Sequence, residues 1–216
     1  MFAEVLLALV AVALVQAFLV KPFGVPSQSM EQTLHIGDRI LVNRLEKDLA
    51  RGDVVVFGHG DTWQDKQLPP ADTVVPRALR AFGDLTGIGP SSTAYTVKRV
   101  IGLPGHTVAC CSTDGRVTVD GEPIDEPYIY EDLPFTAGSL DCTSSPRSTR
   151  CFPEIPVPKE NMLVLGDHRS QSADSVIGCR GATEGPECAR IVAVERVVGP
   201  VVLRFWPPGD IGGIDR

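Results

Sequence analysis

Proline and glycine interrupt this 216-residue chain so often that a long helix is excluded outside its first twenty residues. The sequence contains 18 Pro and 21 Gly, and both residue types disfavour helix interiors. Between these breaks lie short β-branched runs, at residues 39–43, 53–57, 95–101, 116–120, 162–165, 191–198 and 200–205. Such runs, bounded by Gly, Pro or Asp, predict strands. We therefore expect a mainly β fold made of antiparallel strands.

The exception is the apolar run at residues 2–20, FAEVLLALVAVALVQAFLV. A helix of this length spans about 28 Å, close to the hydrocarbon core of a bilayer. A cleaved signal peptide is the alternative, but it would carry a basic N-terminal region and a shorter apolar run. Lys21 is the first basic residue of the chain. We predict an uncleaved transmembrane anchor at residues 1–20, followed by an extracytoplasmic domain at residues 21–216.

The six cysteines, rather than the charges, place that domain outside the cell. No basic residue precedes the apolar run, so the positive-inside rule does not predict an external domain. The cysteines lie in loop-like sequence without a C-x-x-C pair, which suits an oxidising compartment. Six cysteines allow 15 pairings. Residues 142 and 151, and residues 179 and 188, each bracket a short loop that a disulfide could close. Free buried thiols are the alternative.

The charge balance excludes one class of partner. Asp and Glu number 27 against 20 Lys and Arg, which gives a net charge of -7. An acidic chain without a basic block lacks the clustered positive charge that nucleic-acid binding needs. With no H-E-x-x-H motif and four His, the sequence also gives no reason to expect a metal or another cofactor.

Two segments depart from the strand pattern. Residues 60–93 are expected to form an insertion on the β body, with Pro76 at the first position of a short helix. Residues 135–158 are expected to form a second loop, bracketed by cysteines. Loops of this kind are usually solvated, although either could tune the choice of substrate or partner.

Serines and one lysine are the candidates for chemistry. Ser27 and Ser29 lie in the Pro-framed stretch PSQSM, soon after the apolar run. Lys98 lies within a strand-like run, and residues 166–175 read GDHRSQSADS. A serine alone means little, because its hydroxyl becomes a nucleophile only beside a base.

Two residues could serve as that base. His168 follows Asp167, but the G-x-S-x-G motif of many Ser-His-Asp hydrolases is absent. A lysine acts as a base only when neutral, which requires burial to lower its pKa from about 10.4 by about 2–3 units. Strand alternation places Lys98 and Arg99 on opposite faces. One of them is buried if both faces are covered; an edge strand with both residues in water is the alternative.

Four stretches resemble the bacterial type I signal peptidases, which are membrane-anchored Ser/Lys peptidases. They are PSQSMEQTL at 26–34, GDRILVNR at 37–44, KRVIGLPG at 98–105 and GDHRSQSADS at 166–175. They follow the family's order, directly after an apolar anchor. The resemblance implies an antiparallel β catalytic domain of the signal-peptidase type with a single N-terminal transmembrane helix.

The resemblance also implies roles for five polar residues. Ser29 would be the nucleophile, and Lys98 the general base that later protonates the leaving amine. Ser27 would donate its hydroxyl to the oxyanion, together with the backbone N–H of Ser29. Ser172 would hydrogen-bond the Lys98 amine, and Asp174 would support the site from behind.

Three apolar residues match positions that help to form the family's substrate pockets, namely Phe23, Val25 and Val97. Small pockets of this kind would explain the family's preference for A-x-A sequences. The chain departs from the family at Val176, where an Arg that pairs with the preceding Asp is common. Arg169 is a candidate replacement.

The resulting prediction is a membrane-bound serine endopeptidase that removes signal peptides from exported preproteins at the outer face of the plasma membrane. Its partners would be secretory preproteins and the lipid bilayer. One alternative is a non-catalytic anchored β module that binds peptides or envelope components. Another is a specialised processing peptidase with the same Ser/Lys pair.

Overall fold

The computed structural model describes residues 18–60, 93–182 and 185–215, with scattered positions among residues 4–16 and 63–83. Half of the predicted anchor, and nearly all of the predicted 60–93 insertion with its short helix at Pro76, therefore lie outside the described residues. Among the described residues, none of the helices is both long and apolar enough to cross a membrane.

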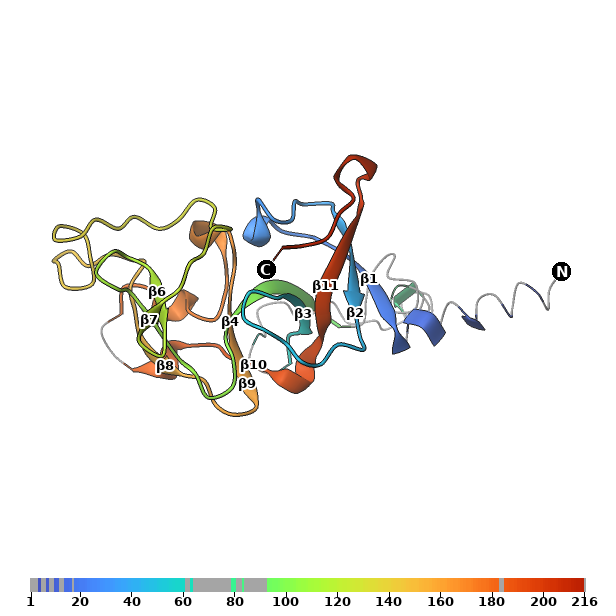
Figure 1. The fold of residues 1–216 in the computed structure, drawn as a ribbon, viewed down its shortest axis with the longest axis horizontal. Coiled ribbons are helices and arrows are strands. Elements are labelled where there is room, and N and C mark those ends of the chain that lie inside the picture. Colours follow the sequence, from blue (N-terminus) through green and yellow to red (C-terminus); the bar gives the residue numbers. More distant parts are fainter. Residues whose placement is uncertain are drawn as a thin grey trace.

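The described strands form two antiparallel sheets, as the sequence predicts (Figure 1). The larger sheet has the order β1-β2-β11-β3-β4-β9-β10. Its strands are β1 (Val20–Gly24), β2 (Arg39–Asn43), β3 (Val54–Gly58), β4 (Tyr95–Gly102), β9 (Asn161–Leu165), β10 (Val192–Ala193) and β11 (Val197–Trp206). The smaller sheet has the order β7-β6-β5-β8. Its strands are β5 (Thr107–Cys110), β6 (Val117–Val119), β7 (Glu122–Pro123) and β8 (Phe152–Pro156).

Short 3₁₀ helices lie in the connections between strands. They are η1 (Gln28–Met30), η2 (Arg169–Gln171), η3 (Ile177–Cys179), η4 (Pro186–Cys188), η5 (Val194–Arg196) and η6 (Pro208–Asp210). Helices η1, η2 and η3 matter most below, because the candidate site residues lie in them or beside them.

Strand β11 joins the two parts of the larger sheet. It pairs with β2 through Val201 and with β3 through Pro200 (Figure 1). The change of partner occurs beside Gly199, where a Cβ would collide with the carbonyl oxygen of Asn43. A glycine is therefore required at this close approach of two backbones.

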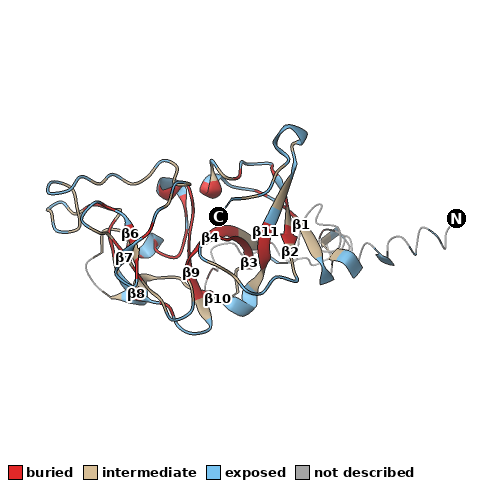
Figure 2. Ribbon diagram, in the orientation of Figure 1, coloured by how far each residue is buried: buried red, intermediate tan, exposed pale blue. Residues whose placement is uncertain are grey.

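Buried apolar residues form three clusters, and β3 and β4 are buried along much of their length (Figure 2). Lys98 and Arg99 on β4 are 3% and 1% exposed. Both faces of β4 are thus covered, and the alternative of an exposed edge strand is wrong. Strand alternation then sends the two basic side chains to opposite sides of the sheet.

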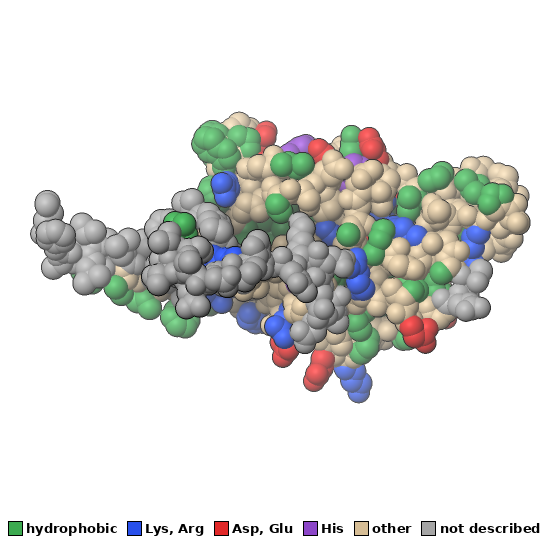
Figure 3. Space-filling model, turned by 180° about the vertical axis from the view of Figure 1, so that it is seen from behind, with side chains coloured by type: hydrophobic (Ala, Val, Ile, Leu, Met, Phe, Trp, Pro, Cys, Tyr) green, Lys and Arg blue, Asp and Glu red, His purple; other side chains and the backbone are tan. Residues whose placement is uncertain are grey.

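The far end of β11 is different in character. Phe205 and Trp206 at its end, and Ile211 just after η6, are exposed large hydrophobic residues. Together they form an apolar hairpin end, which projects from the β body (Figures 1 and 3). Clustered exposed side chains of this kind typically mark a contact surface.

The six cysteines form three disulfides, so the alternative of free buried thiols is wrong. Two of the bonds join Cys142 to Cys151 and Cys179 to Cys188, the pairs that the spacing suggested. The third joins the neighbours Cys110 and Cys111.

The smaller sheet shows where the sequence reasoning was incomplete. Strands β5, β7 and β8 were not anticipated, and β8 lies at the end of the segment expected to be a loop at 135–158. The predicted strand at 191–198 is instead divided among β10, η5 and the beginning of β11.

Candidate active site

Ser29 and Lys98 lie against each other, although 69 positions separate them in the sequence. The Lys98 Nζ donates a hydrogen bond to Ser29 Oγ at 2.5 Å and another to the carbonyl oxygen of Val97 at 3.0 Å. Lys98 comes from the central strand β4, and Ser29 from η1, just beyond β1. A hydroxyl and an amine at this distance have the geometry of a nucleophile and its base.

The Ser29 turn is fixed by its neighbours. Val25 donates its backbone N–H to the Asp38 carbonyl and accepts one from Gly37, which closes the loop around η1. Met30 is 1% exposed and anchors the turn in the core. Ser29 is therefore held by backbone hydrogen bonds and by apolar packing.

Lys98 and Ser29 both lie in a poorly solvated environment. The Lys98 side chain is 3% exposed, and Ser29 is 7% exposed. Burial in a poorly solvated site penalises the charged form of an amine. A neutral amine is the form that can accept the hydroxyl proton of Ser29.

Ser27 lies beside the nucleophile on the solvent side. Its Oγ is 3.4 Å from Ser29 Oγ, and Ser27 itself is exposed. A substrate carbonyl approaching Ser29 would therefore meet the Ser27 hydroxyl. The structure brings these two serines together, while the oxyanion role of Ser27 stays a prediction.

Ser172 is buried at the back of the site, but it does not form the expected hydrogen bond to Lys98. Its Oγ has no hydrogen-bond partner among the residues that the structure describes. It lies directly against Gly166, where a Cβ would overlap the Ser172 side chain and would approach the Ser29 carbonyl oxygen to 2.5 Å. Gly166 therefore separates Ser172 from the nucleophile turn by the smallest possible residue.

Asp174 is fully buried behind Gly166 and has a basic partner. Its Oδ2 accepts hydrogen bonds from the Gly166 backbone N–H at 3.3 Å and from the Arg180 guanidinium at 3.1 Å. Its Oδ1 accepts the N–H of Val176 at 3.2 Å. The suggested replacement, Arg169, is wrong, because its guanidinium pairs with Glu126 and donates to the Gly166 carbonyl instead.

Asp167 and His168 do not form a catalytic couple with Ser29. The Asp167 carboxylate accepts two hydrogen bonds from Arg99, at 2.9 and 2.7 Å, and one from the Thr33 hydroxyl at 2.5 Å. The His168 ring lies instead between Glu31 and Glu131. The alternative of a Ser-His-Asp arrangement therefore has no geometric support.

The three predicted pocket residues belong to one hydrophobic cluster beside Ser29. Phe23, Val25 and Val97 are 9%, 4% and 8% exposed. The Phe23 ring makes an edge-to-face contact with Tyr95, with ring centroids 5.0 Å apart. The sequence reasoning missed Tyr95. The feature that could have identified it is its position three residues before Lys98 on the same strand.

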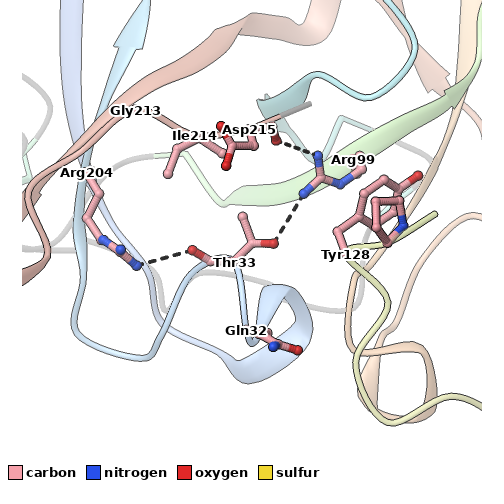
Figure 4. Close-up of a pocket in the computed structure, with 9 residues that line it drawn as sticks. Gln32, Thr33, Arg99, Tyr128, Arg204, Gly213, Ile214 and Asp215 are labelled. Atoms are coloured by element: carbon pink, nitrogen blue, oxygen red, sulfur yellow. Dashed lines mark hydrogen bonds between the residues drawn. The ribbon is translucent and has the colours of Figure 1, made fainter.

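A cavity of about 390 Å³ lies on the Arg99 side of β4 (Figure 4). In it, the Arg99 guanidinium donates to Thr33 Oγ1 and to the Asp215 carbonyl, and it stacks 3.8 Å from the Tyr128 ring. Burial, followed by the nearby Glu126 carboxylate, raises the pKa of the Tyr128 phenol. Ser29 and Lys98 do not line this cavity.

The sulfur atoms of Cys111, Cys142 and Cys151 lie within 4.8 Å of one another. All three belong to disulfides, and a metal ion requires a thiolate. Among the described residues, this group therefore offers no metal site in its oxidised form.

Comparisons with known proteins agree on one family. The family model described as signal peptidase, peptidase S26, matches residues 1–206. A probable signal peptidase I of Mycobacterium leprae is 33% identical, over 97% of this chain and 77% of its own length. Signal peptidase I of Mycobacterium tuberculosis is 33% identical, over 95% of this chain and 72% of its own length. Signal peptidase I of Bacillus licheniformis is 27% identical, over 98% and 90%.

A solved structure was also found. A crystal structure of a signal peptidase I from Enterococcus faecalis is 22% identical and covers 71% of this chain and 96% of its own. The TM-score is 0.36.

Proposed function

We propose that Ser29 and Lys98 are the catalytic pair with which this peptidase cleaves signal peptides. The chain belongs to the signal peptidase family, peptidase S26. The hydrogen bond of 2.5 Å between Lys98 Nζ and Ser29 Oγ carries the proposal. It joins a buried lysine to a serine in the turn after β1. A module that only binds peptides would not require a hydrogen bond between a buried lysine and a serine.

In the proposed reaction, neutral Lys98 accepts the proton of Ser29 as Oγ attacks the scissile carbonyl carbon. The Lys98 ammonium then donates that proton to the leaving amine, and the peptide bond breaks. The acyl group stays on Ser29. Lys98 next removes a proton from water, the hydroxide attacks the ester, and the proton returns to Ser29 Oγ.

The negative charge that develops on the carbonyl oxygen needs donors already in place. We assign this role to the Ser27 hydroxyl and the backbone N–H of Ser29. The loss of one such donor typically lowers kcat by about 10²- to 10³-fold. Ser27→Ala is therefore expected to be slow but not inactive.

The substrate would lie extended along the outer edge of the larger sheet. Strand β1 is at that edge and pairs only with β2 among the described strands. An added strand would gain main-chain hydrogen bonds there. Its small side chains would meet the cluster of Phe23, Val25 and Val97, which fits the A-x-A preference.

The proposed site of action is the outer face of the plasma membrane. A single anchor at residues 1–20 would hold enzyme and substrate on one bilayer and so raise their effective concentration. Three disulfides suit an extracytoplasmic domain. The apolar hairpin end, with its exposed Trp206, supports contact with lipid.

The test is cleavage of a preprotein with an A-x-A site by the purified full chain in detergent, with the cut located by mass spectrometry. Ser29→Ala and Lys98→Ala should abolish cleavage. The matched controls are the exposed Ser139→Ala and Lys159→Ala, which should leave it unchanged.

Cleavage that survives Lys98→Ala would refute the Ser/Lys mechanism. No cleavage by the folded, oxidised wild-type chain would refute the proposed substrate class. Cleavage confined to one or two preproteins would indicate a specialised processing peptidase instead.

A further inference from the structure

The buried carboxylate of Asp174 needs a positive charge nearby, and its nearest neighbours in the sequence do not supply one. The residue is 0% exposed, and its carboxylate accepts two backbone N–H groups. Burying a charged carboxylate is costly unless it is both hydrogen-bonded and paired with a positive charge. That charge comes from Arg180, whose guanidinium lies 3.1 Å from Asp174 Oδ2 and is 11% exposed.

The backbone around Arg180 is fixed from both sides. Cys179, just before it, is fully buried and joined by a disulfide to Cys188. Just after it, the Gly181 N–H donates to the Cys151 carbonyl at 2.7 Å. These constraints leave the arginine little freedom to move away from Asp174.

The path from Asp174 to the reacting atoms is short. Asp174 holds the Gly166 N–H, and Gly166 touches both the Ser29 carbonyl and the Ser172 side chain. A displacement of Asp174 would therefore reach the nucleophile turn through one residue.

We propose that Arg180, fixed by the Cys179–Cys188 disulfide, is a positioning residue for the catalytic pair and acts through Asp174. The proposal rests on the function proposed above. In this proposal, the Cys179–Cys188 disulfide supports catalysis as well as closing a loop.

The first experiment is a double-mutant cycle on the full chain with the preprotein substrate. Arg180→Gln should lower kcat by about 10- to 100-fold, because displacements of about 1 Å near a reacting centre cost that much. KM should stay within about threefold, because Arg180 lies behind the site. Arg180→Lys should recover part of the loss.

In an Asp174→Asn background, Arg180→Gln should change kcat by less than about threefold, since the two residues act as a unit. The control Arg116→Gln breaks an exposed Arg–Asp pair and should have no effect. If Arg180→Gln alone fails to fold, the double variant is expected to fold, because it leaves no unpaired buried charge.

The second experiment removes the disulfide. Cys179→Ser with Cys188→Ser should reproduce the kcat loss of Arg180→Gln. Cys110→Ser with Cys111→Ser, which opens a disulfide that does not hold the backbone of Arg180, should cost kcat much less.

Folded Arg180→Gln that keeps its kcat within twofold of wild type would refute this role of Arg180. A double variant whose loss of kcat equals the product of the two single losses would refute it as well. The inference is also wrong if both disulfide variants behave alike. In each case the wild-type chain still cleaves the preprotein, so these outcomes differ from a failure of the proposed function, in which the wild-type chain is inactive.

Discussion

Replacing Gly166 with alanine adds one methyl group at the centre of the site. Gly166 does not have the left-handed backbone that strains an alanine, so the perturbation is steric. The new Cβ would stand 2.5 Å from the Ser29 carbonyl oxygen and would overlap the Ser172 side chain. Neither neighbour is the free end of a long side chain, so one of them must move.

The size of that movement sets the expected effect. An ordinary contact of this kind begins at 3.4 Å, so Ser29 or Gly166 must shift by about 0.9 Å. A displacement of about 1 Å can cost about 100-fold in rate. This corresponds to about 2.7 kcal/mol in the activation free energy. The added methyl group should also lower the free energy of unfolding by about 1–3 kcal/mol, as overpacking does.

The assay is kcat/KM on the A-x-A preprotein, with thermal unfolding measured on the same samples. Gly209→Ala is the matched control, because a Cβ there meets no atom of the described residues within 4 Å. It should keep full activity. Gly166→Ala with wild-type kcat/KM would refute the argument that Gly166 sets the distance between Ser172 and the nucleophile turn.

Two further predictions concern buried and exposed carboxylates. Asp167→Asn leaves the buried Arg99 guanidinium without its counterion. The substitution should therefore lower the free energy of unfolding, measured by urea denaturation, by about 3–5 kcal/mol. A loss below about 1 kcal/mol would contradict this expectation. Backbone hydrogen bonds, chiefly from Thr143 and Gly138, hold the pKa of the Asp141 carboxyl at about 2. Because this pKa is below its ordinary value of 3.8, the carboxylate stabilises the fold above about pH 4, and this contribution disappears as the pH falls through 2. The difference in urea midpoint between wild type and Asp141→Asn should shrink over that range, and a constant difference would be the contrary result.

Much of the larger sheet could be predicted because its strands carry their own signals. The run at 39–43 is β2 residue for residue, and the run at 95–101 is β4 apart from its last glycine. Strand β1 could not be read in the same way. It contains Pro22 and begins at Val20, the last residue of an apolar run of helical length, so no period-2 pattern marks its start.

The smaller sheet was harder to predict because its strands depend on tertiary contacts. Strand β8 reads FPEIP, and two prolines make a weak strand signal. The sequence became a strand through pairing with β5 and through burial of Phe152 and Ile155. Such contacts do not show in local patterns.

For the site, the sequence resemblance named the residues, and the structure supplied their partners. Ser29 and Lys98 were nominated from motifs, and the structure places them in contact. The pairing of Asp174 with Arg180 was not foreseen, because it crosses a turn whose path depends on a disulfide. The expected bond from Ser172 to Lys98 is absent, while the amine donates to Ser29 and to the Val97 carbonyl.

The position of β11 between β2 and β3 affects when Ser29 and Lys98 can be aligned during synthesis of the chain. Ser29 belongs to the hairpin of β1 and β2, and Lys98 to the strand pair of β3 and β4. Among the described strands of the sheet, these two halves are joined only through β11, which comes after the other strands in chain order. A nascent chain that already carries both residues still lacks the sheet that aligns them. The sheet therefore aligns Ser29 with Lys98 only after β11 has been made and has paired with both halves.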